Sequence, residues 1–158
     1  MLASPAPVPI DVEEFLQHWR AIPKTGLIPS LREFLDFRVF RQQSEVAIID
    51  VVGPTEMRFR LFGTGLSLLA GEDMTGKNLL EQFHPQTRVE ALRIIWASVS
   101  TPCGYILHRT FRRGAVETGT VGIGLRCCMN KAARFGLWGS VPLPVERPAS
   151  SGTRKAPS

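Results

Sequence analysis

VAIIDVVGPTEMRFRLF, residues 46–62, is the stretch that decides the fold class. Residues 46–52 are almost all apolar and rich in β-branched side chains, which is typical of a strand at the centre of a sheet. Residues 57–62 alternate, so that Met57, Phe59 and Leu61 face one way and two arginines face the other. Because the GPTE segment between these runs is a turn, the stretch predicts a β-hairpin with one covered face.

The rest of the chain places helices on both sides of this hairpin and further strands at the end. Apolar spacing and capping residues predict helices over 11–22, 30–41, 65–70, 78–83 and 85–100, and extended segments predict strands over 104–113, 116–129 and 134–142. Hairpin-length links favour an antiparallel five-stranded sheet with helices on one face, preceded by N-terminal helices. The predicted fold class is α+β.

Length and composition fit one globular domain, since 44% of the 158 residues are hydrophobic and 21% are charged. We expect this domain over residues 11–143, with an N-terminal helical segment (11–42) followed by the sheet and its helices (46–143). A disordered leader over 1–10 and a disordered tail over 144–158 would flank it. Apolar runs are too short to cross a bilayer, and the proline-containing start does not resemble a signal peptide, which predicts a cytoplasmic protein.

Three cysteines predict neither a disulfide framework nor a zinc site. Cys103, Cys127 and Cys128 are odd in number and lack the C-x-x-C spacing. Neighbouring residues on a strand point to opposite faces, so the adjacent pair would not form one site. We interpret all three as structural thiols.

GEDMTGK, residues 71–77, fits the G-x-x-x-x-G-K pattern of a phosphate-binding loop. That loop needs Ser or Thr next and a strand before it, whereas here Asn78 follows, two acids lie inside and the preceding segment is predicted to be helical. We interpret it as a turn whose glycines take positive φ. The histidines at 18, 84 and 108 show no metal-ligand or catalytic spacing. The sequence therefore predicts no catalytic, cofactor or metal residues, no nucleotide binding and no enzyme.

The chain around the hairpin carries a set of short motifs: Trp19, GLIPS at 26–30, Phe34, IDV at 49–51, RFRLFGT at 58–64, and Gly71, Asp73, Thr75 and Gly76. Together they resemble the bacterial PAS-like regulatory family of small stand-alone domains. The resemblance is detailed over residues 19–83 and rests only on the order of elements over 85–142. It implies a non-catalytic sensory or regulatory fold without a known ligand. Haem and a flavin–cysteinyl photosensor are not expected, because the long helix lacks histidine and the helical block lacks cysteine.

One strand departs from the pattern of that family. Residues 116–129 contain three glycines, Gly119, Gly122 and Gly124, and end in LRCCM, where a smoother apolar run ending in Pro-Leu is expected. The Pro-Leu pair comes later, at residues 142–143. These departures predict an irregular or shortened C-terminal sheet.

The net charge of +5 is unevenly distributed. Between Leu107 and Gly136 the sequence has one acid, Glu117, and these basic residues: Arg109, Arg112, Arg113, Arg126, Lys131 and Arg134. Such a segment is compatible with nucleic acid, an anionic membrane or an acidic protein as partner. No recognition helix or interleaved aromatic pattern accompanies it, so a solvated sheet face is favoured over nucleic-acid binding.

A set of large side chains is predicted to converge between the sheet and the helices: Phe59, Leu66, Leu69, Phe83, Trp96, Leu107 and Phe111. They form either a packed core or a pocket for a small apolar or aromatic ligand. Arg109 has the same parity on its strand as Leu107 and Phe111. It either reaches water at the rim or Glu117, which we favour, or points inward and binds an anionic ligand such as a carboxylate.

Three functions follow from these features. The first is a ligand-responsive or protein-interaction sensory domain that signals through a partner. The second is a dimerisation or adaptor module with a packed core and no ligand; Phe15, Leu16 and Trp19, on one face of the first helix, would form a homodimer interface. The third is a basic nucleic-acid-binding protein, tested by salt-sensitive DNA binding.

Overall fold

The hairpin at residues 46–62 is confirmed as strands β1 (Val46–Gly53) and β2 (Glu56–Phe62), paired antiparallel. A computed structural model describes residues 10–24, 26–37, 41–101, 103–130 and 133–148, with side chains described as far as Cys128 apart from those of 111–113. β1 is buried at each of its first four positions, which agrees with the unbroken apolar run that predicted a central strand.

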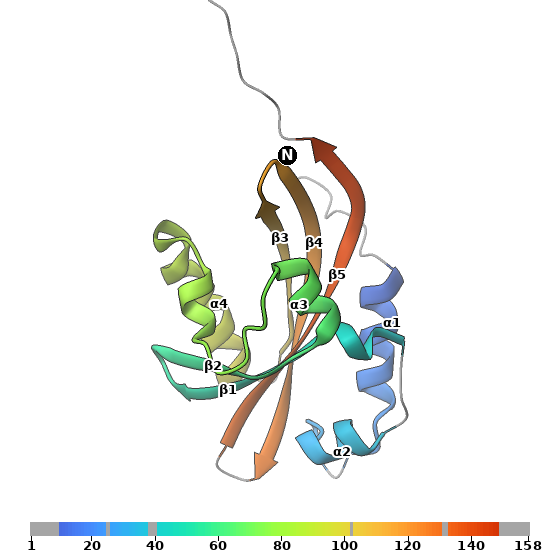
Figure 1. The fold of residues 1–158 in the computed structure, drawn as a ribbon. Helices are drawn as coiled ribbons and strands as arrows, with labels where there is room; N and C mark the ends of the chain where they lie inside the picture. Colours follow the sequence, from blue (N-terminus) through green and yellow to red (C-terminus); the bar gives the residue numbers. More distant parts are fainter. Residues whose placement is uncertain (1–9, 25, 38–40, 102, 131–132, 149–158) are drawn as a thin grey trace, which may run out of the picture.

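Three further strands complete the sheet: β3 (Tyr105–Arg113), β4 (Val116–Asn130) and β5 (Ala133–Pro148). The strand order is β2-β1-β5-β4-β3, and each neighbouring pair is antiparallel. The last strand thus inserts beside the first. β5 also extends to Pro148, which pairs with Val116, so this strand is longer than the predicted strand over 134–142. Together with the helices, this antiparallel sheet confirms the α+β class (Figure 1).

The helices cover both faces of the sheet rather than one. Helices α3 (Thr64–Ala70) and α4 (Pro85–Ser100), with the 3₁₀ turn η2 (Leu79–Gln82), pack on the face that presents Ala47 and Ile49. Helices α1 (Ile10–Ala21) and α2 (Leu31–Asp36) pack on the opposite face, against Val46, Ile48 and apolar residues of β4. Figure 1 shows α4 and α1 on opposite sides of the long strands. Since β1 is apolar on both faces, each face needs a helical cover.

Part of the apolar stripe of helix α1 is buried inside the domain. Phe15 is 1% exposed and belongs to the core between α1, α2 and β4, whereas Leu16 and Trp19 are only partly buried. The prediction that Phe15, Leu16 and Trp19 together form one exposed face is therefore wrong, because Phe15 is buried in the core of its own domain.

The second helix begins as predicted but ends earlier. The Ser30 hydroxyl accepts a hydrogen bond from the Glu33 amide at 3.1 Å, and the Glu33 carboxylate accepts one from the Ser30 amide at 2.6 Å, which forms the capping box. The helix ends at Asp36, and residues 41–45 form the 3₁₀ turn η1 (Arg41–Glu45) instead of a continuation of α2.

Helical spacing along residues 85–100 predicts an apolar stripe of Val89, Leu92, Trp96 and Val99, and the buried face of α4 differs from it. Val89 is 75% exposed, and the buried residues are Ala91, Ile95 and Val99, at i, i+4 spacing, together with Ser98. Trp96 packs against this core only partly buried. A pattern with several apolar positions on neighbouring helix faces allows more than one orientation, and the contact of α4 with the sheet selects one of them.

Candidate ligand pocket

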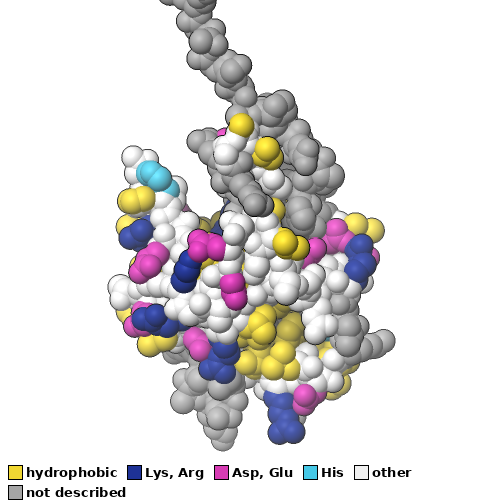
Figure 2. Space-filling view, viewed as in Figure 1, with side chains coloured by type: hydrophobic (Ala, Val, Ile, Leu, Met, Phe, Trp, Pro, Cys, Tyr) yellow, Lys and Arg dark blue, Asp and Glu magenta, His cyan; other side chains and the backbone are white. Residues whose placement is uncertain are grey.

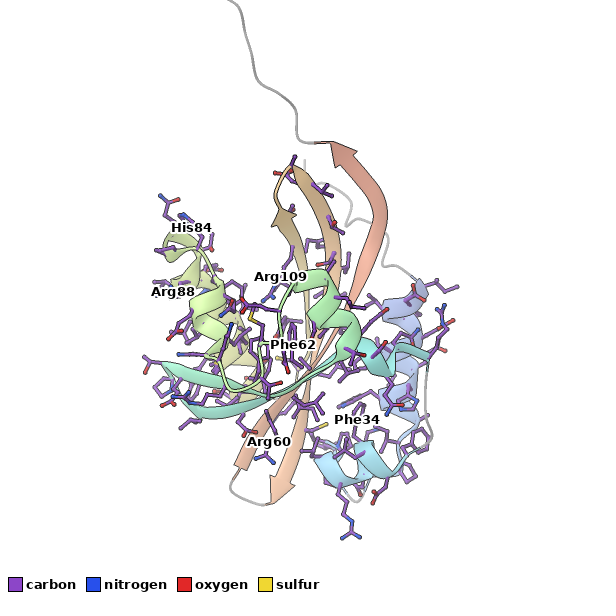
Figure 3. All side chains as sticks on the ribbon, viewed as in Figure 1. Phe34, Arg60, Phe62, His84, Arg88 and Arg109 are labelled. Carbon is purple, nitrogen blue, oxygen red and sulfur yellow. The ribbon has the colours of Figure 1, made fainter. Side chains whose placement is uncertain are left out.

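A half-open pocket of about 610 Å³ lies between the inner face of the sheet, α3 and α4. Its floor comes from β2 and α3, one wall from β3 and the other from the first half of α4. The residues that line it are Phe59, Phe62, Leu66, Ala70, Met74, Gln82, Phe83, His84, Gln86, Thr87, Glu90, Ala91, Ile94, Leu107, His108, Arg109 and Thr110. In Figure 3 Phe62 and Arg109 lie in the space between α3 and α4, and Phe34 lies apart from it beside α2.

A β-bulge in β2 shapes the floor of the pocket. Ile48 pairs with Leu61 and Ile49 with Phe59, so Arg60 is an extra residue on β2. The bulge reverses the alternation beyond it: Phe62 turns inward at 9% exposed, and Leu61 turns outward at 43%. The ring of Phe62 lies edge-on to that of Phe59, with 5.0 Å between centroids. The prediction that Leu61 shares the covered face of Phe59 is therefore wrong, and Phe62 was missed.

The loop that resembles a phosphate site has a structural role beside this floor. The amide of Gly76 donates to the carbonyl of Phe59 at 2.7 Å, and the amide of Phe59 donates to the carbonyl of Lys77 at 3.0 Å. The Lys77 ammonium pairs with Glu72. Gly71 and Gly76 have φ of 85° and 83°, as predicted for a turn. These bonds attach the loop to the outer edge of β2.

Two glycines of β4 lie opposite large side chains of β3. Tyr105 lies opposite Gly124 and Leu107 opposite Gly122, in a register without shifts along this hairpin. A Cβ on Gly124 would lie 2.2 Å from the ring of Tyr105, so glycine is required for that ring to pack across the strand. The expected irregularity of β4 is therefore absent from its pairing with β3; it is found toward β5, where the register shifts between Thr118 and Thr120 and again between Cys128 and Asn130.

Arg109 lies in the wall of the pocket. Its guanidinium carbon stands 4.6 Å from the centre of the Phe83 ring, in cation–π contact. Burial lowers the pKa of Arg109 to about 10, although the nearby phenol of Tyr105 acts in the opposite sense, so the side chain is still a cation at neutral pH. The register places Thr120 opposite Arg109 and Glu117 opposite Arg112. Arg109 thus lines the pocket, and Glu117 does not lie directly across the hairpin from it.

Most of the predicted pocket residues come together here. Phe59, Leu66, Phe83, Leu107 and Arg109 line the pocket. Leu69 and Trp96 do not; both are partly buried, and Trp96 packs against the core below the pocket. The side chain of Phe111 lies outside the described residues.

A second groove of about 690 Å³ lies on the other side of β3, beside α1. It is lined by Leu16, Trp19, Arg20, Leu27, Ile28, Cys103, Gly104, Tyr105, Ile106, Ile123, Leu125 and Arg126. Leu27 is 86% exposed and Ile106 is 45% exposed. The groove combines apolar side chains with two arginines, and it was not predicted from the sequence because its walls come from four separate segments.

Two of the six basic side chains between residues 107 and 136 are among those that the structure describes. Of these, Arg109 lines the pocket and Arg126 lines the groove, while the side chains of the other four lie outside the described residues. Figure 2 shows charges of both signs mixed over the face in view.

The three cysteines differ in exposure, and none of the described residues gathers into a metal site. Cys103 is exposed, whereas Cys127 is buried, and burial raises the pKa of its thiol to about 12. Within the described ranges no three His, Cys, Asp or Glu side chains are placed to hold a metal ion. Over the same ranges, no helix has the length and apolar character needed to span a membrane.

Comparison with known proteins agrees with this architecture. A family model described as "PAS domain" matches residues 10–122, from the start of α1 to the middle of β4. No match to the chain is found among the curated proteins or among the solved structures.

Proposed function

Because the chain belongs to the PAS domain family, we propose that it is a sensory, regulatory domain that binds a small, mainly apolar ligand in the pocket between β2, β3, α3 and α4. The observation that carries this proposal is the pocket itself. Its volume of about 610 Å³ lies within the range of small-molecule sites, and its floor of Phe59, Phe62 and Leu66 is apolar. A few polar groups at its walls would orient the ligand.

The elements around the pocket give a ligand a means of changing the domain. Helix α4 packs on the sheet through Ala91, Ile95 and Val99, and its first half borders the pocket. A ligand that contacts both α4 and β3 would stabilise their present arrangement over any more open one, by an amount set by its affinity. The domain would act without catalysis and would pass this change to a partner protein. We propose that it does so in the cytoplasm.

A pocket-filling variant tests ligand binding. Ile94 lines the pocket, and Ile94→Trp is expected to remove ligand binding by occupying the space. Val89→Trp is the matched control, since Val89 lies on the same helix, is 75% exposed and does not line the pocket. Native mass spectrometry of protein purified from its own host should show an added small-molecule mass in the wild type and in Val89→Trp, and not in Ile94→Trp.

The same three proteins should differ in a thermal-shift screen. Compounds that raise the melting temperature of the wild type should have no effect on Ile94→Trp. A wild type that carries no added mass, and that no small apolar compound stabilises, would contradict ligand sensing and favour a module with a packed core.

The second candidate function, a protein-interaction module, is favoured by the groove beside α1. Its apolar side chains include the exposed Leu27 and Ile106, and a surface of this kind often marks an interface. Arg20 and Arg126 line the same groove. A symmetric dimer would bring two copies of this basic groove together, so an acidic, partly apolar partner segment fits it better than a second copy does. The homodimer predicted from α1 stays a prediction.

Site-specific crosslinking in the host cell tests this second function. A photoreactive residue at position 27 is expected to crosslink to a protein whose contacting segment is acidic, identified by mass spectrometry. Position 68 is the control, because Leu68 is 77% exposed on α3 and borders neither cavity. Crosslinks from position 27 to another copy of this chain would support the homodimer instead, and equal products from both positions would contradict a docking site.

A further inference from the structure

The edge strand beside the groove indicates how a partner protein would bind. We propose that β3 accepts an extended, acidic and partly apolar segment of a partner as an additional strand along residues 104–108, while the groove beside α1 receives side chains of that segment. This inference rests on the proposed protein-interaction function of the groove and specifies the conformation and the charge of the partner segment.

β3 forms one edge of the sheet. It is the last strand in the strand order, where it pairs with β4, and Figure 1 shows it as the outermost of the long strands. Its register with β4 runs from Tyr105 to Arg113 without a shift. Proteins usually protect long, regular edges with a bulge, a proline or a covering segment, because another strand can pair with them. A regular edge strand is therefore a template for strand addition.

The opposite edge of the sheet, at β2, has such a cover. The loop over residues 76–78 exchanges backbone hydrogen bonds with Phe59, and the Asn78 side chain accepts one from the Met57 amide at 3.2 Å. Arg58 also forms an isolated bridge with Asn78. Within the described ranges no comparable bridge reaches β3. The fold thus covers one edge of the sheet with its own chain and leaves the edge beside the groove for a partner.

Both cavities open onto the edge of β3. Consecutive residues at its start, Cys103, Gly104, Tyr105 and Ile106, line the groove, and residues 107–110 line the pocket. Neighbouring side chains of a strand point to opposite faces, so a cavity that contacts consecutive residues reaches the backbone of the strand. An added strand would therefore lie where the groove begins, with alternate side chains directed to the two faces of the sheet.

The charge of the groove selects an acidic segment. Arg20 and Arg126 line the groove, and none of the residues that line it is an acid. Arg20 is exposed, whereas Nε of Arg126 is buried and makes no hydrogen bond within the part of the chain that the structure describes. Leaving a buried N–H without an acceptor is costly, and carboxylates are strong acceptors for guanidinium groups. Carboxylates on the partner segment would supply these acceptors.

The apolar surface of the groove favours an extended segment over other occupants. A small anion would leave the exposed side chains of Leu27 and Ile106 uncovered, whereas a peptide strand would contact them while its backbone pairs with β3. Two copies of this chain paired through β3 would bring two arginine-lined grooves together, which like-charge repulsion opposes. The partner segment therefore belongs to another protein.

Alternating peptides test this inference on the full chain. The probes are peptides of about eight residues in which glutamate alternates with valine, isoleucine or leucine, and the controls carry lysine in place of glutamate. Calorimetry at low salt is expected to show at least one glutamate peptide binding about tenfold or more tightly than its lysine counterpart. At saturation, amides within residues 104–108 should exchange their hydrogens about tenfold more slowly or less, because the added strand accepts their hydrogen bonds.

Variants of the two groove arginines test the charge selection. Arg126→Met and Arg20→Met are each expected to reduce the preference for the glutamate peptide to about threefold or less. Arg88→Met is the matched control, since Arg88 is exposed on α4 and lines neither cavity, and it should keep the full preference. Circular dichroism and thermal melting will show whether each variant is folded; the exposed position of Arg20 makes its variant the one least dependent on packing.

Several outcomes would overturn strand addition. These are failure of every glutamate peptide to bind, equal binding of glutamate and lysine peptides, a preference that survives in both groove variants, or binding that leaves exchange over residues 104–108 unchanged. Slow exchange there in concentrated protein without peptide, lost on dilution, would support the homodimer instead. The docking function would still stand if position 27 crosslinks to an acidic segment whose binding leaves these amides unprotected.

Discussion

Gly63→Ala is expected to lower the free energy of unfolding by about 3 kcal/mol, at the upper end of the range for overpacking. A Cβ at position 63 would lie 2.2 Å from the backbone oxygen of Ser44 and 2.9 Å from that of Val46. Backbone atoms cannot move aside by changing a rotamer, so β2 and the turn before β1 would have to separate. That shift would also weaken the hydrogen bond from the Gly63 amide to the Val46 carbonyl, which is 3.0 Å long.

Urea denaturation of Gly63→Ala and Gly53→Ala measures this effect. Gly53 ends β1, and a Cβ there would meet no atom within 4 Å, so its variant should stay within about 0.5 kcal/mol of the wild type. Equal stability changes in the two variants would show that Gly63 is not held against the backbone of Ser44. Gly63 is also the N-cap of α3, so the same close contact fixes how that helix leaves the sheet to border the pocket.

Phe59→Ala is expected to lower the free energy of unfolding by about 3–5 kcal/mol, the usual range for deleting a buried phenylalanine ring. Phe59 is 2% exposed, packs edge-on against Phe62 and joins the core beneath the pocket. Its backbone also holds the loop at Gly76 and Lys77, but those bonds do not involve the ring and should persist. The loss should therefore be one of packing.

Leu61→Ala provides the matched control on the same strand. Leu61 is 43% exposed on the other side of the bulge, and its truncation should cost about 1 kcal/mol or less. Denaturant unfolding of both variants gives the comparison. If Leu61→Ala lowered the free energy of unfolding as much as Phe59→Ala does, Leu61 would have to be buried. That result would mean that β2 keeps a regular alternation and has no bulge at Arg60.

The pattern of the sequence was sufficient wherever a feature depends on neighbours along the chain. The hairpin, the capping box of Ser30 and Glu33, the left-handed Gly71 after α3 and the start of α4 at Pro85 were all predictable. Alternation along β3 was likewise enough to place Arg109 on the same face as Leu107, and both line the pocket. In each case the decisive contacts lie within a few residues of one another.

Several parts of the pocket and the groove could not be predicted because they depend on pairing between distant segments. The bulge arises from a register shift between β2 and β1. Because of it, Phe62 lies in the floor of the pocket and Leu61 does not. The buried face of α4 was also chosen by its contacts with the sheet and not by its own pattern.

The sequence alone determined the α+β class, the order of its elements and the residues that cap them, since these follow from local periodicity and backbone preference. Tertiary structure decided that α1 and α2 cover the second face, that β5 inserts beside β1, and that a pocket remains between α4 and β3. A cavity is the volume that packed elements fail to fill. Its size and lining depend on how whole helices and strands are positioned against each other, and no stretch of consecutive residues specifies that arrangement.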